Sequence, residues 1–242
     1  MSSATDIHPT QPRLSSNDSA VLQALFDAES APSSAVKIDS TLPSLPGLSP
    51  QALESLRNRE RGLIRRLQSP NPSRGTVESV ITELDHLIKK NPSYPSAYMN
   101  RAQAMRMLFD LDDEDALFAP ETVDIASQIF SDLGQAIALA TPRSPADPVS
   151  PLQARILADA HTHRGYILLK AAKVRLAGSD GGPDRLRGLE KDQLEEMASR
   201  DFFLGGRYGN RIAQQLAVQT NPYAKMCGAI VKEAMRKEVE GV

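Results

Sequence analysis

Two histidines and an acidic run are the residues of this sequence whose types could hold a metal ion. His161 and His163 stand two positions apart, and residues two apart on a helix point about 200° apart, so they cannot share one ion. The run Asp110–Asp115 resembles a calcium loop, with Glu121 at the twelfth position, but Asp115 stands where the turn of such a loop requires glycine. We therefore expect no metal site and interpret the acidic run as a solvated loop.

Nucleophilic and phosphate chemistry have one candidate each. Cys227 is the single cysteine, no histidine or aspartate accompanies it in a recognisable arrangement, and its neighbours Met226 and Ile230 are apolar, so we expect it to pack. The glycine-rich stretch 178–183 has no lysine followed by serine or threonine, which a phosphate-binding loop needs, and we interpret it as a flexible turn. The sequence therefore predicts no catalytic residue, no cofactor and no enzymatic activity.

The composition excludes several classes of partner. The chain has 242 residues, with 28 lysines and arginines against 30 aspartates and glutamates and a net charge of −2, which argues against binding nucleic acid or an anionic membrane. No apolar run is long enough to span a bilayer, and a single cysteine fits a reducing compartment. We expect a cytoplasmic protein.

The elements that position these residues are predicted to be helices. Residues 1–49 are rich in proline and serine and predict a mostly disordered arm, with a short amphipathic helix near 17–27 that we expect to dock on the rest of the protein. From Ser49-Pro50 onward, apolar residues recur at helical spacing between proline- and glycine-containing breaks. We find no convincing strand, so the predicted fold class is all-α.

Three successive helix pairs share one spacing pattern within residues 50–242. Each first helix carries a small residue that would allow a close helix contact, and each second helix carries apolar residues at helical spacing. The expected packing residues are Gly62, Ala102 and Gly165 in the first helices and Leu84, Leu133 and Phe202 in the second helices. The pattern predicts an α-solenoid of three irregular pairs at about 50–92, 95–141 and 151–210, with C-terminal capping helices at about 210–240.

The segment Asn91–Gln103 resembles the junction between two tetratricopeptide repeats, with a proline closing one unit and Ala-Tyr-x-Asn-Arg-Ala opening the next. This segment, the Asn17–Phe26 stretch before it and the Asn221–Cys227 stretch after it occur in the same order in the tetratricopeptide repeat protein 36 family. The resemblance implies a non-enzymatic repeat adaptor that binds other proteins and is associated with heat-shock chaperones and with tyrosine catabolism.

In such repeats the first helices line a concave groove that binds partners. Counting from the small residues places polar and apolar side chains on that side, where arginine and amide groups can pair with carboxylates or peptide backbone. The predicted groove residues are Arg59, Arg66, Met99, Asn100, Gln103, Arg106 and Tyr166.

Chaperone-binding repeats use a clamp of lysines, asparagines and arginine to hold an acidic carboxyl-terminal tail. Asn100 matches its expected place and Arg59 can stand for a lysine, but Leu63 stands where an asparagine belongs, and Asp159 and His163 replace the basic pair. Asp159 would repel a carboxylate tail. If a chaperone binds, we expect a contact other than this clamp.

The resemblance leaves two functions open. One is an adaptor that protects or regulates a metabolic enzyme, such as an enzyme of tyrosine breakdown. The alternative is a cochaperone that binds a heat-shock chaperone through the groove.

Overall fold

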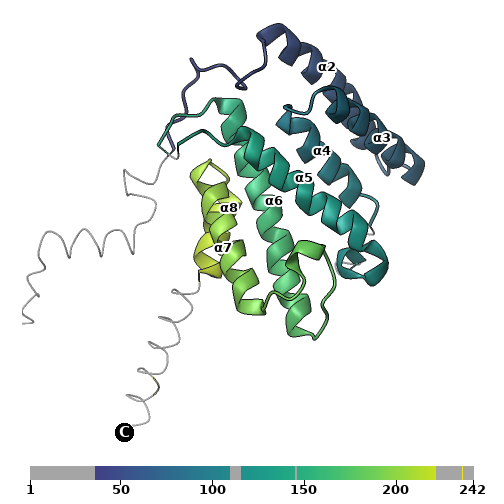
Figure 1. The fold of residues 1–242 in the computed structure, drawn as a ribbon, viewed down its shortest axis with the longest axis vertical. Helices are drawn as coiled ribbons and strands as arrows, with labels where there is room; N and C mark the ends of the chain where they lie inside the picture. Colours follow the sequence, from purple (N-terminus) through teal and green to yellow (C-terminus); the bar gives the residue numbers. More distant parts are fainter. Residues whose placement is uncertain (1–35, 110–115, 145, 222–235, 237–242) are drawn as a thin grey trace, which may run out of the picture. The chain divides into compact units, whose positions relative to one another are not determined.

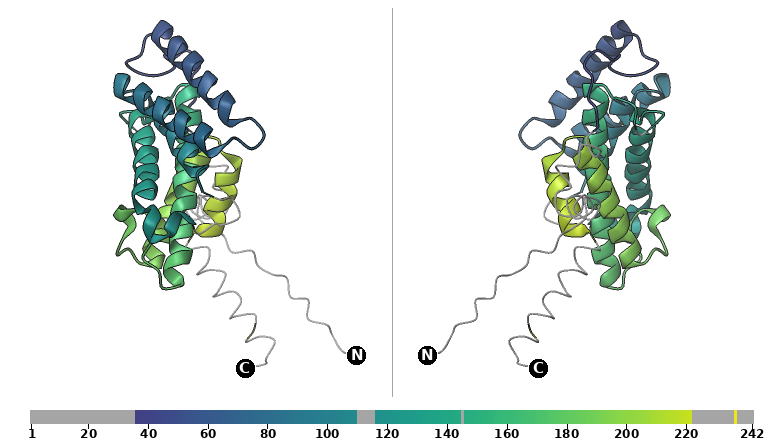
Figure 2. Two further views of the ribbon diagram at one scale, coloured as in Figure 1. Left: turned by 90° about the vertical axis from the view of Figure 1, so that its right-hand side faces the viewer. Right: turned by 90° about the vertical axis from the view of Figure 1, so that its left-hand side faces the viewer.

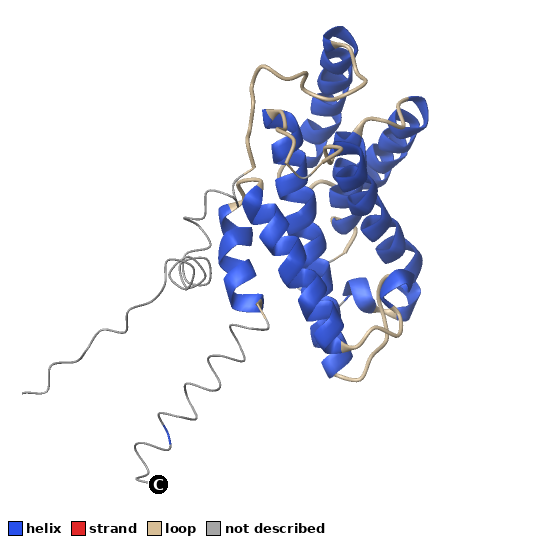
Figure 3. Cartoon of the chain, turned by 60° about the vertical axis from the view of Figure 1, so that its left-hand side comes forward, coloured by secondary structure: helices blue, strands red, loops and turns tan. Residues whose placement is uncertain are grey.

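The computed structural model describes residues 36–109, 116–144, 146–221 and 236. The helix expected near 17–27, the acidic run 110–115, Cys227 and the capping helix expected beyond Asn221 lie outside the described residues. Within them the chain forms α-helices and short 3-10 turns and no strand, as Figure 3 shows, so the all-α prediction is confirmed. The α-helices are α2 Pro50–Leu67, α3 Arg74–Lys90, α4 Pro95–Arg106, α5 Val123–Ala140, α6 Pro151–Leu176, α7 Lys191–Arg207 and α8 Arg211–Thr220.

Local capping residues determine where these helices begin. The side chain of Ser49 accepts a hydrogen bond from the backbone N–H of Ala52, and a proline follows it in the first turn of α2. Ser150 and Gln153 form a reciprocal capping box at the start of α6. Asn210 accepts a hydrogen bond from the N–H of Ala213 and starts α8. These are local signals, which explains why the helix starts could be predicted closely.

The helices between residues 50 and 220 pack in chain order. Each helix lies mainly against the one before it and the one after it, and α4 also contacts α2 and α6. Figures 1 and 2 show this progression from α2 and α3 at one end to α7 and α8 at the other. Such neighbour-to-neighbour packing is the arrangement that a helical repeat requires. No described helix combines the length and the apolar character that crossing a membrane would demand.

The packing residues predicted from the repeat pattern lie in one continuous core, with one exception. Leu84, Leu133 and Phe202 have no exposed surface, and Ala102 is 1% exposed. A Cβ atom added to Gly165 would lie 2.8 Å from the ring of Phe202, so a side chain larger than hydrogen would disturb the contact between α6 and α7. These residues hold successive helices together.

Gly62 is the exception, and the close contact expected there is absent. Gly62 is exposed, and a Cβ atom added to it would meet nothing within 4 Å. The contact between α2 and the core is made instead by Leu63, which is 4% exposed, and by Leu53 and Leu56 on the same helix. The residue type matches the pattern at Gly62, but the face of α2 on which it lies is turned away from the neighbouring helices.

Alanine substitutions at these two glycines should have opposite effects. We expect Gly62→Ala to raise the free energy of unfolding by about 1 kcal/mol, because glycine weakens a helix interior and nothing obstructs the new methyl group. We expect Gly165→Ala to lower it by about 1–3 kcal/mol, because the buried ring of Phe202 must move. Urea denaturation of both variants beside the wild type measures this, and stabilisation by both would contradict the close contact at Gly165.

The boundary between the arm and the helical unit requires a correction for residues 36–49. Leu45 is 2% exposed and belongs to the core. Ile38 forms a parallel bridge with Val149, and Ser150 donates a hydrogen bond of 2.6 Å to the carbonyl of Ser44. The prolines and serines of this stretch suggested disorder, but one buried leucine and backbone bonds to the start of α6 attach it to the helical unit.

The glycine-rich stretch 178–183 is also anchored, rather than a free turn. A Cβ atom added to Gly182 would lie 2.5 Å from the ring of Phe118, in the enlarged turn between α4 and α5. Arg175 donates to the carbonyls of Leu186 and Leu189, at 3.0 Å and 2.9 Å. The enlarged turns of the second and third helix pairs therefore pack on each other, and the glycines allow that close approach.

Candidate protein-binding cleft

A cleft of about 470 Å³ opens between the first half of α6, the start of α8 and the N-terminal segment at Ile38. The cap at Ser150 sets the register of α6, which places Arg155 and Asp159 one helical turn apart on one side of the helix. Gly209 has a φ of +105°, and the turn that it allows leads into the cap of α8 and brings Arg211 into the wall of the cleft.

Two glycines of α7 bring α8 close to the body of the protein. A Cβ atom added to Gly205 would lie 2.7 Å from the hydroxyl of Thr162 on α6 and 3.1 Å from the methyl group of Ala213 on α8. A Cβ atom added to Gly206 would lie 2.8 Å from Gln214. The three helices α6, α7 and α8 thus meet at Gly205, and this contact determines how far apart the walls of the cleft stand.

Asp159 is the carboxylate of the cleft. Partial burial raises its pKa above the ordinary value, and the nearby Arg155 acts in the opposite direction. No residue of the described part of the chain forms a hydrogen bond or an ion pair with this carboxylate. The desolvation of Asp159 is therefore offset only in part, by the charge of Arg155 and not by a hydrogen bond.

Tyr208 forms another part of the cleft wall and stands on a buried polar network. Its ring stacks on that of His161, with centroids 6.3 Å apart. His161 is hydrogen-bonded through Nδ1 to Asp201 at 2.7 Å, and Arg164 donates two hydrogen bonds of 2.7 Å to the same carboxylate. Asp201 is 3% exposed, and these bonds keep its pKa low despite burial. The network joins α6 to α7 and supports the aromatic ring from behind.

The same arrangement occurs one repeat earlier, between α4 and α5. Arg101 donates hydrogen bonds of 2.8 Å and 2.6 Å to Asp132, which is 2% exposed, and also binds Asp85 of α3. Arg101 and Arg164 each precede the small packing residue of their helix, and Asp132 and Asp201 each precede the apolar packing residue of theirs. The repeat pattern contained this signal, an arginine and an aspartate at equivalent positions, and the sequence reasoning missed it.

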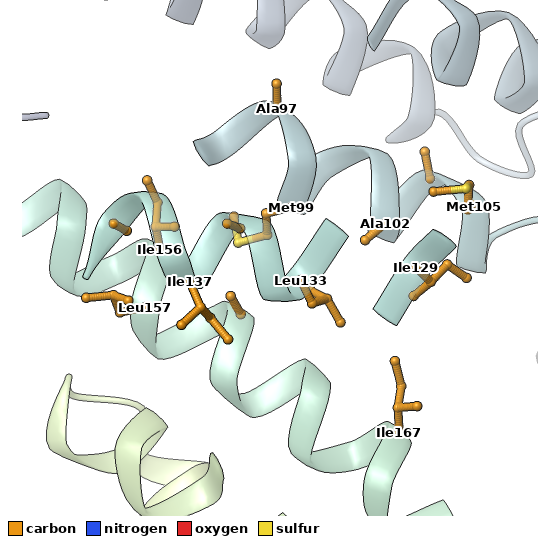
Figure 4. Close-up of a cluster of buried hydrophobic side chains, with 14 of the residues drawn as sticks. Ala97, Met99, Ala102, Met105, Ile129, Leu133, Ile137, Ile156, Leu157 and Ile167 are labelled. Carbon is orange, nitrogen blue, oxygen red and sulfur yellow. The ribbon is translucent and has the colours of Figure 1, made fainter. Parts of the chain in front are cut away.

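Three predicted groove residues make contacts within the chain. Met99 is 5% exposed, and Figure 4 shows it in the buried cluster with Leu133 and Ile137. Asn100 is 9% exposed and donates a hydrogen bond of 2.6 Å to Glu60. Arg66 donates to Glu83 and Ser79, so it joins α2 to α3. The groove positions of Met99 and Asn100 are corrected, because the side of α4 that contacts its neighbours extends further round the helix than the spacing indicated. The side chain of Arg66 is 39% exposed, and its role in binding stays a prediction.

The remaining predicted groove residues are accessible to different degrees. Arg59 and Arg106 are exposed, and Gln103 is partly buried. Tyr166 is 37% exposed and packs edge-on against Phe202, with ring centroids 5.4 Å apart. A role for these four residues in binding stays a prediction.

The carboxylate clamp expected of chaperone-binding repeats is not assembled among the described residues. The amide of Asn100 is occupied by Glu60, and that carboxylate also accepts a hydrogen bond of 2.8 Å from Tyr94. Leu63 lies in the core, and Asp159 contributes a negative charge on α6. The positive charges that line the described cleft belong instead to Arg155 and Arg211, and the sequence had shown no reason to single out either residue.

Comparison with known proteins finds relatives along the whole chain. The L-tyrosine degradation gene cluster protein hmgX of Aspergillus fumigatus is 62% identical over 255 residues, which cover 100% of both chains. Tetratricopeptide repeat protein 36 of Mus musculus is 26% identical over 90% of this chain and 92% of its own length. The protein of the same name in Danio rerio is 25% identical over 92% of this chain and 94% of its own length. No family model and no solved structure matches the chain.

Proposed function

Because the chain belongs to the family of the hmgX protein and is similar to tetratricopeptide repeat protein 36, we propose that it is an adaptor which binds an enzyme of tyrosine breakdown and catalyses no reaction itself. The adaptor would protect or regulate that enzyme. The observation that carries this proposal is the 62% identity, over the full length of both chains, to a protein named for a tyrosine degradation gene cluster.

The architecture supports a binding role. Helices that pack mainly on their chain neighbours leave a long accessible surface, and repeat proteins use such surfaces to bind other proteins. The buried side chains Asp132, Asp201 and His161 are bonded across helix contacts, Asp132 to Arg101 and Asp201 to His161, and so have a structural role. The charged groups of the cleft, Asp159, Arg155 and Arg211, form no hydrogen bond or close ion pair with described residues and are the ones available for a partner.

Binding by itself can protect an enzyme. A protein that binds only the folded state of its partner stabilises that state by about 2.7 kcal/mol when its free concentration is about 100 times the dissociation constant. Stabilisation of this size lowers the unfolded fraction of the partner about 100-fold, and with it the fraction exposed to proteolysis or aggregation. The proposed function therefore needs no chemistry from the adaptor.

We expect this chain to bind one enzyme of the tyrosine degradation pathway of its own organism and to raise the thermal midpoint of that enzyme. Purified full-length chain is added to each purified pathway enzyme, and binding is measured by calorimetry and unfolding by differential scanning fluorimetry. Bovine serum albumin replaces the chain in the control. Absence of binding to every pathway enzyme would contradict the proposal, and so would conversion of tyrosine or of a breakdown product by the chain alone.

A further inference from the structure

We propose that the cleft between α6 and α8 binds a partner segment in which a lysine or arginine stands between acidic residues. The basic group binds Asp159, and the acidic groups bind Arg155 and Arg211. This inference rests on the proposed function, because it describes the chemistry by which the adaptor recognises a protein.

The carboxylate of Asp159 favours a cationic ligand. Its carboxylate is partly buried in a cleft and has no hydrogen bond or ion pair with the described residues. The charge of Arg155 offsets part of the free energy of desolvating this carboxylate, and a donor hydrogen-bonded to it would recover more. An ammonium or guanidinium group of a bound protein would supply that donor, and an acidic group would be repelled.

The two arginines of the cleft favour acidic groups on the same ligand. Arg155 precedes Asp159 by one turn of α6, and Arg211 lines the same cleft from the first residue of α8. Both are exposed, and neither forms a hydrogen bond or a close ion pair in the described part of the chain. A guanidinium group binds a carboxylate through two parallel hydrogen bonds. The cleft has one negative group, Asp159, and two positive groups, so a ligand with one positive and two negative groups is complementary to it in charge.

The cleft also has an apolar surface that a ligand would cover. Ile38 is 50% exposed and Ile212 is 57% exposed, and both line it. The methylene chain of a bound lysine or arginine, or an apolar residue next to it, would cover these side chains while the charged head reaches Asp159. A segment that is basic, acidic and apolar in alternation therefore matches this surface better than a uniformly acidic tail.

The walls of the cleft are preformed. Asp39 N–H and Val149 N–H make backbone hydrogen bonds of 2.9 Å and 3.0 Å that attach the segment around Ile38 to the start of α6. Tyr208 is held by its stacking on His161, and α8 is held by the close contacts of Gly205. A preformed site loses less conformational entropy on binding, which favours a short segment as its ligand.

Three fluorescein-labelled peptides test the proposal by fluorescence anisotropy with the full-length chain. The first has a lysine between two glutamates with apolar residues among them, the second has the charges inverted, and the third is an acidic heat-shock chaperone tail with a free carboxyl terminus. We expect the first to bind at least about ten-fold more tightly than the other two. Equal binding of the first two peptides would overturn the proposal, and preferential binding of the acidic tail would favour the cochaperone alternative and overturn it as well.

Variants of one carboxylate identify the contact. Asp159→Asn should weaken binding of the first peptide at least about ten-fold. Asp159→Lys should reverse the preference, so that the third peptide, the acidic tail, binds more tightly than the first. A misfolded variant would not reverse a preference, so the second substitution keeps the test informative. Asp192→Asn on α7 is the matched control, because that carboxylate is 94% exposed and should change nothing. Unchanged binding by Asp159→Asn would overturn the proposal.

The same variants separate this inference from the proposed function. If a tyrosine-pathway enzyme binds the wild type and binds Asp159→Lys equally well, the adaptor role stands and the cleft is not its binding site. If the first peptide binds as expected and no pathway enzyme binds, the cleft chemistry stands and the role in tyrosine breakdown is wrong.

Discussion

Replacing Asp201 with alanine should lower the free energy of unfolding by about 3–5 kcal/mol, because the change leaves the buried ring of His161 and the partly buried guanidinium group of Arg164 without their hydrogen-bond partner. Asp201 is 3% exposed and accepts hydrogen bonds of 2.7 Å from Arg164, and its distance to Nδ1 of His161 is also 2.7 Å. Without it, the guanidinium group of Arg164 keeps its charge at the contact between α6 and α7 with no counter-charge. Chemical denaturation monitored by circular dichroism measures the loss.

An exposed ion pair is the control for Asp201. Asp184 and Arg187 lie 2.9 Å apart with side chains 58% and 57% exposed, so Asp184→Ala should cost about 1 kcal/mol or less. Asp132→Ala should resemble Asp201→Ala, because Asp132 is 2% exposed and binds Arg101 in the equivalent place. A loss below about 1 kcal/mol for both buried aspartates would show that these pairs do not hold the helix contacts together.

Acidification should destabilise the protein through His163. Burial, and after it the positive charge of Arg106, lowers the pKa of His163 from 6.5 to about 4. The unfolded chain therefore takes up this proton at higher pH than the folded chain, so stability falls as the pH drops from about 6.5 to about 4 and His163 adds no further loss below that range. The full contribution is about 3 kcal/mol, from 1.36 kcal/mol for each pH unit.

The variant His163→Gln isolates this contribution, because it removes the titrating group and keeps a polar side chain. The free energy of unfolding of the variant should decline less steeply than that of the wild type between pH 6.5 and 4. Carboxylates such as Asp201 are present in both proteins and cancel in the comparison. Parallel pH profiles would mean that the folded protein does not resist protonation of His163.

The helix starts and the fold class could be predicted because they depend on neighbouring residues. Ser49-Pro50 and Ser150-Pro151 begin α2 and α6 as expected, and in each pair the serine caps and the proline occupies the first turn. The order of motifs likewise indicated the resemblance to tetratricopeptide repeat protein 36, which is 26% identical over 90% of this chain. A capping hydrogen bond spans three residues and needs no other part of the chain.

The exposure of the expected groove side chains could not be predicted as well, because exposure depends on how far each helix is turned toward its neighbours. Met99 and Asn100 were placed in the groove by spacing alone, yet one lies in the core and the other is bonded to Glu60 of another helix. Gly62 matches Gly165 in the repeat pattern, but only Gly165 faces a bulky ring. A rotation of one helix that the sequence does not specify interchanges core and surface.

His161 and His163 show which properties follow from the sequence and which follow only from the tertiary structure. From the sequence alone it followed that two histidines at this spacing cannot share an ion, that the chain is helical, and where most helices begin. Only the tertiary structure decided that His161 binds Asp201 of α7, that His163 lies near Arg106 of α4, and that Asp159 is left with two arginines in a cleft. Caps and periodicity act within one helix, whereas burial and pairing arise from contacts between residues that are tens of positions apart.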